Sequence, residues 1–315
     1  MPNWVIGIDL GATKIALGLV SPTNEIIERR RILTNAIDGP EQAVRRTAAA
    51  IAELRDALPP GEAIAAVGIC SPGPIDHTAG LIVDPPNLPG WLNVPFQQML
   101  ADATGLPVVL EHDAKAAALG EYHYGAGRGE RSMVYIVAGT GVGAAIIIDG
   151  QLYRGLHNFA GEVGGITINH DGPPCPSGVR GCVQEYICGP GLARRYRALN
   201  PQAPVDVTGE QVAELAAAGD APARQIIAEA GEALGITVAS MAMILDIGLY
   251  VIGGSVVKAG DLLLEPARRA VPNFSFASVA AGTRIEPVAL DDDSPLLGCA
   301  WLAREEGGQG SRAQG

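Results

Sequence analysis

The sequence has few aromatic residues and no excess of positive charge. Aromatic residues make up 4% of its 315 residues, so its hydrophobic cores must be built from Ala, Val, Leu and Ile. The net charge is 22 − 34 = −12. Because such a chain does not attract polyanions through its overall field, we expect no nucleic-acid partner. A phosphate site must then be built from backbone N–H groups rather than from a basic patch.

Cysteines and long apolar segments are also scarce. The five cysteines are an odd number, which is not typical of a disulfide scaffold. The N-terminus has no basic segment followed by an apolar stretch. The longest uncharged run, Ser132 to Ile148, has 17 residues and three glycines, which is short for a membrane span. We therefore expect a soluble, cytoplasmic protein without a membrane partner.

Hydrophobic periodicity predicts alternating strands and helices. The length of the chain suits about two domains. The predicted strands are Trp4–Asp9, Ile15–Val20, Ile26–Leu33, Ile64–Cys70, Val108–Leu110, Val134–Ala138, Val142–Ile148, Leu249–Ile252 and Ile285–Leu290. The predicted helices are Glu41–Leu58, Phe96–Thr104, Asp113–Tyr124, Glu210–Leu215, Ala221–Ile244, Leu262–Ala270 and Ser294–Arg304. The pattern indicates an α/β protein.

Two strand–turn–strand modules lie about 130 residues apart. The first turn belongs to Asp9-Leu10-Gly11-Ala12-Thr13-Lys14, and the second to Gly139-Thr140-Gly141-Val142-Gly143. Glycine lets the backbone of such a turn approach a phosphate closely. Neither has the spacing of a Walker A or a dinucleotide motif. They are either two phosphate-binding turns of a duplicated protein or two ordinary hairpins.

Asp113, in Glu111-His112-Asp113-Ala114-Lys115, stands where a predicted helix begins. Aspartate is a common N-cap residue, so capping alone explains its position. A carboxylate there is also kept ionised by the helix N-terminus, which suits a base that accepts a proton from an alcohol.

Residues 155–190 are rich in Gly, Pro and Cys, and irregular stretches of this length are usually functional. Cys175 and Cys182 are seven positions apart, and two cysteines are too few for a closed zinc site. His170 or Cys188 would have to complete it. The alternative is a loop with free cysteines.

Nine segments, in this order, resemble the ROK group of sugar kinases and repressors in the actin-like ATPase superfamily. They are Ile8–Lys14, Gly68–Pro74, Asn87–Trp91, Glu111–Gly129, Gly139–Gly143, Gly161–Gly164, Gly172–Glu185, Val251–Val256 and Leu290–Cys299. The resemblance implies a two-lobed α/β fold of the actin-like (ribonuclease H-like) type with a cleft between the lobes. It implies a small lobe of residues 1–115 plus 294–306 and a larger lobe of residues 116–293. The polar, Gly-rich composition of residues 307–315 predicts a disordered tail.

The same resemblance implies ATP-dependent phosphorylation of a hydroxyl, usually the 6-OH, of a hexose or related sugar, with ATP and Mg²⁺ as cofactors. Asp113 is implied as the catalytic base. The implied nucleotide-binding residues are Asp9, Gly11, Thr13, Lys14, Gly139, Thr140, Gly141, Gly253 and Gly254. The implied sugar-binding residues are Gly73, Asn87, His112, Asp113, Glu162, Gly165 and Glu185.

The chain departs from the family pattern at four positions. His112 and Lys115 replace asparagines, Gly165 replaces a histidine, and Ser177 replaces a cysteine. The last two changes remove two of the family's four zinc ligands, so we expect the structural zinc to be absent and assign no metal-ligating residue. His112 and Gly165 alter sugar contacts, which predicts a substrate other than plain glucose. Lys115 either helps neutralise a phosphate or simply lies in the first helical turn.

Several other functions compete with this prediction. A repressor of the same family carries a DNA-binding segment ahead of the first hairpin, which here begins at residue 4. The others are a catalytically inactive sugar-binding or regulatory protein, a kinase of an amino sugar or cyclitol, and a chaperone- or filament-type ATPase. By resemblance we also expect a homodimer.

Overall fold

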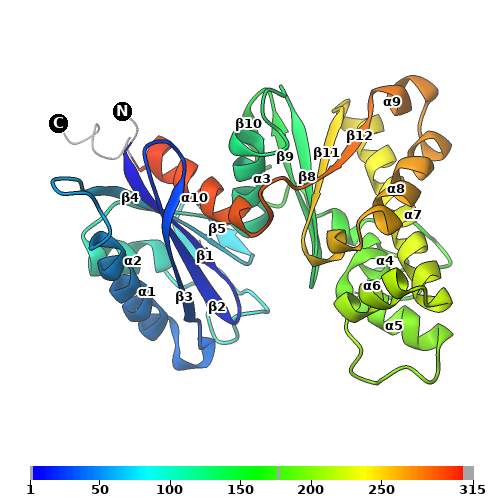
Figure 1. Ribbon diagram of the computed structural model, residues 1–315, viewed down its shortest axis with the longest axis horizontal. Coiled ribbons are helices and arrows are strands. Elements are labelled where there is room, and N and C mark those ends of the chain that lie inside the picture. Colours follow the sequence, from blue (N-terminus) through cyan, green and yellow to red (C-terminus); the bar gives the residue numbers. More distant parts are fainter. Residues whose placement is uncertain (1–2, 176–177, 308–315) are drawn as a thin grey trace. The chain divides into compact units, whose positions relative to one another are not determined.

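The computed structural model describes residues 3–175 and 178–307, and these residues form two compact units (Figure 1). The first unit comprises residues up to Arg128, the short segment Gly155–Asn158 and the residues from Leu290 onward. The second unit comprises Gly129–Arg154 and Phe159–Ala289. The predicted tail begins with Gly307, and its remaining residues lie outside the described part of the chain.

The first unit is built on a five-stranded sheet of order β3-β2-β1-β4-β7. Its strands are β1 (Trp4–Leu10), β2 (Lys14–Val20), β3 (Ile26–Leu33), β4 (Ile64–Ser71) and β7 (Val108–His112). β2 is antiparallel to β1 and β3, whereas β1, β4 and β7 run parallel. The carboxyl ends of the three parallel strands therefore meet at one edge, which brings the residues after each strand together. A short hairpin, β5 (Ile75–Asp76) and β6 (Leu81–Ile82), follows β4.

Helices cover both faces of this sheet. α1 (Pro40–Arg55) and α2 (Phe96–Thr104) bury their apolar faces against one side, together with Leu88 and Trp91. α10 (Ser294–Glu305) packs on the other side through Leu297, Ala300 and Ala303, and α3 (Asp113–Tyr124) lies against α10. Two further turns, η1 (Ala36–Asp38) and η4 (Asp291–Asp293), are 3₁₀ helices.

Glycines let α10 lie almost in contact with its neighbours. A Cβ on Gly68 of β4 would meet the carbonyl oxygen of Cys299 at 1.9 Å, and one on Gly298 would meet that of Ala116 at 1.7 Å. The buried carboxylate of Glu121 accepts hydrogen bonds from the Ser294 hydroxyl (2.6 Å) and from the Leu290 amide (3.0 Å). These contacts fix α3, and with it Asp113, relative to the sheet.

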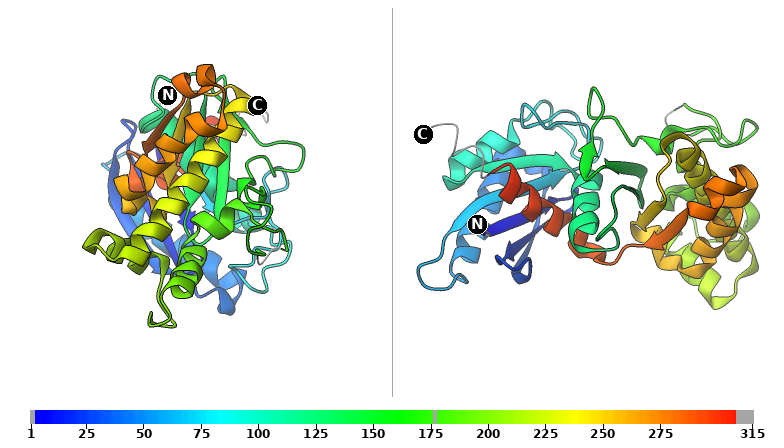
Figure 2. Two further views of the ribbon diagram at one scale, coloured as in Figure 1. Left: turned by 90° about the vertical axis from the view of Figure 1, so that its right-hand side faces the viewer. Right: turned by 90° about the horizontal axis from the view of Figure 1, so that it is seen from above.

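The second unit has a five-stranded sheet of order β10-β9-β8-β11-β12. Its strands are β8 (Met133–Ala138), β9 (Val142–Ile148), β10 (Gln151–Tyr153), β11 (Leu249–Gly253) and β12 (Arg284–Pro287). Its helices are α4 (Val183–Ile187), α5 (Gly189–Leu199), α6 (Gly209–Ala218), α7 (Ala221–Leu245), α8 (Asp261–Phe274) and α9 (Ala277–Gly282), with 3₁₀ turns η2 (Val163–Gly165) and η3 (Ser255–Ala259). α7 and α8 lie side by side, as the yellow and orange helices of Figures 1 and 2 show.

The two sheets repeat one topology. In each, an antiparallel hairpin (β1–β2 or β8–β9) is extended by a third antiparallel strand on one side and by two parallel strands on the other. This arrangement agrees with the duplication that the sequence suggested.

The structure also differs from the sequence-based expectations. The first unit extends to Arg128 rather than to residue 115, because α3 packs along α10, and the second unit begins at Gly129 and ends at Ala289 rather than at residue 293. Five short strands and helices, β5, β6, β10, α4 and α9, and the longer α5 were not predicted. α4 and α5 begin with a valine and a Gly-Pro-Gly run, which give no helical periodicity.

α7 is long and apolar enough, by length and composition alone, to cross a membrane. However, 67% of its most apolar window is buried inside the protein, and Gly231 and Gly235 lie against the backbone of α8. This burial is that of a core helix.

Candidate functional site

The first hairpin turn and Asp9 lie at the carboxyl edge of the first sheet. The turn is held by the Gly11 amide, which donates to the Lys14 carbonyl (3.0 Å), and by the Thr34 hydroxyl, which donates to the Gly11 carbonyl (2.7 Å). Ala12 and Thr13 remain exposed at its tip. The turn is thus anchored at its base, and its tip is accessible to a ligand.

Asp9 is partly buried at the end of β1. Burial, followed by the negative charge of Asp113, raises the pKa of the Asp9 carboxyl to about 6, although the Cys70 thiol donates to it at 3.6 Å. A carboxylate that is disfavoured in this way gains most from a nearby cation. Asp9 is therefore suited to hold Mg²⁺, directly or through water.

Asp113 is the first residue of α3, and His112 occupies the N-cap position. The alternative in which Asp113 is merely the cap is therefore wrong. Asp113 Oδ1 accepts a hydrogen bond from the Ala114 amide at 2.6 Å, and its side chain is 44% exposed. The carboxylate is anchored through one oxygen and still reaches solvent, which suits a base for an incoming hydroxyl.

His112 and Gly73 are brought together by strand register. Ser71 of β4 pairs with His112 of β7, so Gly73, two residues further on, lies beside the imidazole. A Cβ on Gly73 would lie 2.6 Å from His112 Cδ2, so only glycine fits there without movement of the ring. Asn87 is exposed in a loop that buried Leu88 and Trp91 fix to the same unit. The first unit thus carries Asp9, Gly73, Asn87, His112 and Asp113.

The second hairpin turn is anchored to α5 of the second unit. The Gly139 amide donates to the Gly141 carbonyl (2.9 Å), and the Gly189 amide at the start of α5 donates to the Gly139 carbonyl (2.8 Å). Gly254, with φ of +89°, lies against β8, where a Cβ would meet the Ala138 carbonyl oxygen at 2.2 Å. A side chain on Gly253 would meet the Tyr135 hydroxyl. Both glycines therefore have a packing role, whether or not adenosine lies over them.

A cavity of about 530 Å³ opens beside this turn. Gly139, Thr140 and Ser255 line one part of it, and the first turns of α5 and α6 with Arg194 and Arg197 line another. Helix N-termini present N–H groups to anions, and the volume suits a small ligand. The cavity has the features of a nucleotide site.

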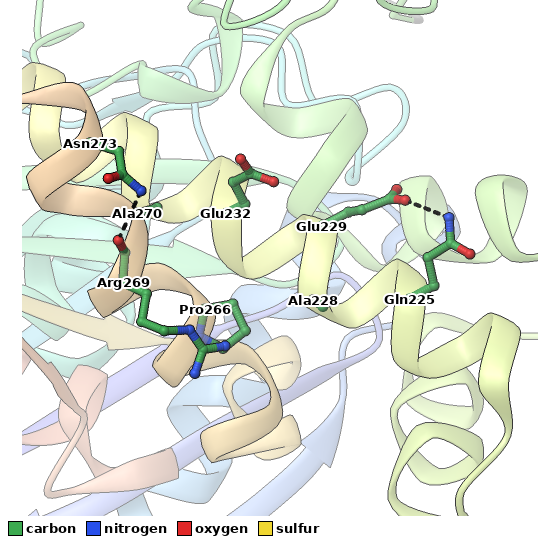
Figure 3. A pocket seen from close by; sticks show the side chains of 8 residues that line it. All are labelled: Gln225, Ala228, Glu229, Glu232, Pro266, Arg269, Ala270 and Asn273. Atoms are coloured by element: carbon green, nitrogen blue, oxygen red, sulfur yellow. Dashed lines mark hydrogen bonds between the residues drawn. The ribbon is translucent and has the colours of Figure 1, made fainter.

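A second cavity, of about 340 Å³, lies between α7 and α8 (Figure 3). Its polar groups bond to one another: Gln225 donates to Glu229 (2.8 Å), and the Asn273 amide donates to the Arg269 carbonyl (3.3 Å). Glu229 also accepts from Arg195, and Glu232 adds a second carboxylate. Two carboxylates and no helix N-terminus make this cavity a poor phosphate site.

The predicted sugar ligands of the second unit differ in environment. Glu162 is exposed ahead of η2, and Gly165 is exposed with no atom within 4 Å of a would-be Cβ. Glu185 is 4% exposed, and both of its carboxylate oxygens are taken by Arg194. Its assignment as a sugar ligand stays a prediction, and a sugar would have to compete with this arginine.

Gln184 is a candidate site residue that the sequence did not reveal. Its Oε1 accepts from the Val142 amide at 3.3 Å and lies 3.4 Å from a would-be Cβ on Gly141. The side chain therefore reaches the second hairpin, whereas Glu185 turns toward α5. The neighbouring Gln and Glu have no sequence signal that separates these roles, because α4 is a five-residue helix without periodicity.

Cys175 and Cys182 form a disulfide bond, with Cα atoms 6.4 Å apart. The alternative of a loop with free cysteines is therefore wrong. Cys188 is occupied as an acceptor for the Gly191 amide (3.3 Å), and the described residues contain no group of three or more His, Cys, Asp or Glu side chains suited to a metal. Since the two sulfurs bond to each other, these residues do not fit a zinc site.

Comparison with known proteins gives a consistent result. The family model described as "ROK family" matches residues 5–306. The chain is 32% identical to a glucokinase of Halalkalibacterium halodurans, over 96% of both chains. It is 33% identical to an N-acetylmannosamine kinase of Citrobacter koseri, over 95% of this chain and 98% of the relative. The crystal structure of a ROK family glucokinase from Streptomyces griseus in complex with glucose and AMPPNP superposes with a TM-score of 0.81, at 31% identity, over 96% and 100% of the chains.

Proposed function

Because the chain belongs to the ROK family, we propose that it transfers the γ-phosphoryl group of ATP to a hydroxyl group, the 6-OH, of a hexose or related sugar. The observation that carries the proposal is Asp113. Its carboxylate stands at the first turn of α3, held through one oxygen and open to solvent, at the same sheet edge as Asp9 and the first hairpin turn.

In the reaction, the sugar hydroxyl oxygen forms a bond to the γ-phosphorus while the bond from phosphorus to the ADP oxygen breaks. Asp113 accepts the proton of that hydroxyl. The transferred group has little covalent chemistry of its own, so the protein contributes mainly position and charge. Mg²⁺, when bound near Asp9, neutralises phosphate charge.

The nucleotide is assigned to the residues that each unit offers. Gly11, Thr13 and Lys14 of the first turn and Gly139, Thr140 and Gly141 of the second are assigned to the phosphates. Because the Gly11 and Gly139 amides already donate within their own turns, the N–H groups come from the other residues of these turns. The cavity beside the second turn, which Ser255 lines, suits the adenosine, and Gly253 and Gly254 directly precede Ser255. A chain of net charge −12 must bind polyphosphate through such local groups.

An amino sugar is the second candidate acceptor. The relative named as an N-acetylmannosamine kinase has 33% identity to this chain, and the one named as a glucokinase has 32%. The open space around Gly165 leaves room for a substituent larger than a hydroxyl group. We further propose that the protein is cytoplasmic and that it is a homodimer. Light scattering tests the homodimer.

The test is a coupled assay of ADP release with ATP, Mg²⁺ and a panel of hexoses, amino sugars and cyclitols. We expect sugar-dependent turnover, with glucose not the best substrate by a wide margin. Asp113→Asn should lower kcat by roughly 10²- to 10⁴-fold and keep nucleotide binding. Asp102→Asn, on the exposed face of α2, is the matched control. Turnover that ignores the sugar contradicts the proposal, and so does an Asp113→Asn variant within about tenfold of wild type. Sugar binding without turnover would instead indicate a regulatory protein.

A further inference from the structure

The buried carboxylate of Glu185 is occupied by an arginine. Arg194 Nε donates to one of its oxygens at 3.1 Å, and Arg194 Nη2 donates to the other. Glu185 is 4% exposed, so water hardly reaches the carboxylate that this pair satisfies. A buried carboxylate that loses its partner is strongly disfavoured, so a ligand gains little by displacing the arginine. Glu185 is therefore directed to Arg194 rather than to a ligand of its own.

Arg194 is directed to the cavity of about 530 Å³ beside the second hairpin turn as well. It lines this cavity together with Gly139, Thr140 and Ser255, and its side chain is 39% exposed. A guanidinium has more N–H groups than one carboxylate accepts. Its hydrogen-bond partner among the described residues is Glu185, so N–H groups remain for a ligand in the cavity.

The backbone around this pair is held in place. A Cβ on Gly191 would meet the Glu185 carbonyl oxygen at 2.2 Å, so α5 begins in contact with α4. The bond from the Gly189 amide to the Gly139 carbonyl ties the start of α5 to the hairpin turn. All of these residues belong to the second unit. Two packed helices, rather than a loop, therefore set the position of the guanidinium relative to the turn.

We infer that Arg194 donates hydrogen bonds to oxygen atoms of the bound nucleotide, and that Glu185 is the positioning residue that holds its guanidinium in place. The inference rests on the proposed kinase function and deepens it, because it moves Glu185 from the sugar contacts to the nucleotide site. Arginine presents its N–H groups in a planar fork that suits phosphate oxygens. A fork that a carboxylate already orients loses less side-chain entropy when the ligand binds.

Two single variants and their combination test the pair. Glu185→Gln keeps the shape of the side chain and removes the charge that orients Arg194, whereas Arg194→Gln removes the fork itself. The measurement is calorimetric titration with the ATP analogue AMPPNP and Mg²⁺, without sugar. We expect the Kd to rise by roughly 3- to 10-fold in Glu185→Gln and by roughly 10- to 100-fold in Arg194→Gln, since hydrogen bonds between charged groups are the strong ones.

The double variant Glu185→Gln/Arg194→Gln should bind AMPPNP as weakly as Arg194→Gln and no more weakly, because Glu185 acts only through Arg194. It leaves no unpaired buried carboxylate, so it reports the loss of affinity even where Arg194→Gln does not fold. Additive losses in the double variant would overturn the inference, because they would show that Glu185 acts on the nucleotide without Arg194.

The matched control is Glu229→Gln. Glu229 forms a similar pair with Arg195, the residue next to Arg194, but it lines the cavity between α7 and α8 (Figure 3). This variant should bind AMPPNP as wild type does. A rise in its Kd equal to that of Glu185→Gln would overturn the inference, because it would show that the loss of any such pair disturbs the unit.

Steady-state kinetics separate the nucleotide from the sugar. With the best sugar of the panel, Glu185→Gln should raise the KM for ATP and leave the KM for the sugar within about twofold of wild type. A higher KM for the sugar with unchanged AMPPNP binding would assign Glu185 to the sugar and overturn the inference. Tighter AMPPNP binding by Glu185→Gln would also overturn it, because Glu185 would then withhold Arg194 from the nucleotide.

The titrations need neither sugar nor turnover. Weaker AMPPNP binding by Glu185→Gln and Arg194→Gln therefore supports the inference even where no sugar is phosphorylated, and sugar phosphorylation with unchanged AMPPNP binding overturns the inference alone. Wild-type protein that binds no AMPPNP would overturn it whatever the sugar assay gives.

Discussion

The ammonium of Lys115 donates a hydrogen bond to the backbone carbonyl of Asn158 at 2.8 Å. Lys115 is 2% exposed, and Asn158 adopts φ of +62°. The two residues are 43 positions apart, yet both belong to the first unit, although the residues on either side of Gly155–Asn158 belong to the second. Lys115 therefore holds the segment Gly155–Asn158 against α3, and Glu162 follows Asn158 by four residues.

Lys115→Met keeps the aliphatic stem and removes the ammonium. We expect it to lower the free energy of unfolding by about 1–3 kcal/mol, because the Asn158 carbonyl loses its charged hydrogen-bond donor. The KM for ATP should change less than about threefold, since the ammonium is directed at a backbone carbonyl. The loss in the free energy of unfolding is too small to unfold the protein.

The measurement is urea denaturation together with ATP kinetics. Lys258→Met is the matched control, because that side chain is 67% exposed and its ion pair with Glu210, at 3.8 Å, contributes little. A large rise in the KM for ATP with unchanged stability would instead assign Lys115 to phosphate binding.

Asp9 gives a prediction for stability against pH. Its pKa is raised from 3.8 to about 6 in the folded protein, so the fold disfavours the charged form. The stabilising contribution of the protonated form is complete below about pH 4 and is lost as the pH rises through about 6. At pH 8, Asp9→Asn should therefore raise the free energy of unfolding of the ligand-free protein by up to about 3 kcal/mol.

The same change should abolish most turnover, because the carboxylate that suits Mg²⁺ is gone. Urea denaturation at pH 4 and pH 8 measures the first effect, with the exposed Asp102→Asn as reference. Equal stabilisation by Asp9→Asn at both pH values would show that the buried charge of Asp9 is not its cause. The rise in the free energy of unfolding must vanish at pH 4, where Asp9 is already protonated.

Gly298 gives a prediction for packing. A Cβ there would lie 1.7 Å from the Ala116 carbonyl oxygen and 2.9 Å from the Gly120 amide nitrogen. Both are backbone atoms of α3, so relief requires that the helices separate. Gly298→Ala should cost about 3 kcal/mol, at the upper end of the range for overpacked cores.

Since α3 carries Asp113, this variant should also lose turnover beyond its loss of stability. Gly282→Ala, with no atom within 4 Å of the new Cβ, should change unfolding by less than about 0.5 kcal/mol. The measurements are denaturation curves and kcat of both variants. Equal stability of Gly298→Ala and Gly282→Ala would contradict the packing argument.

Much of the fold could be predicted from the sequence, because period-2 and period-3.6 patterns mark its longer elements. The bounds predicted for Phe96–Thr104 and Asp113–Tyr124 are those observed. α4 and α5 could not be predicted, because they begin in a Gly- and Cys-rich stretch and depend on tertiary contacts such as the bond from Gly189 to Gly139.

The candidate site was predictable where strand ends determine it. Asp9, Gly73 and His112 follow from parallel strands whose carboxyl ends meet. Side-chain direction was not predictable: Glu185 turns to Arg194, whereas Gln184 reaches the second hairpin. One residue of helix rotation separates these outcomes, and only the packed structure decides it.

The Cys175–Cys182 disulfide gives the last prediction. The other three cysteines, Cys70, Cys188 and Cys299, are free and buried. Alkylation after denaturation without reductant should therefore label three of the five cysteines, and labelling after reduction should reach all five. Mass spectrometry counts the labels directly.

The bond closes a short loop, since its cysteines are seven positions apart. By loop-closure entropy, its loss should lower stability by roughly 2–3 kcal/mol. The double variant Cys175→Ser/Cys182→Ser should show this loss in denaturation curves with and without reductant, whereas wild type should show it only with reductant. Five labelled cysteines in the unreduced protein would contradict the bond, and zinc found in the same sample would show that the sulfurs bind metal instead.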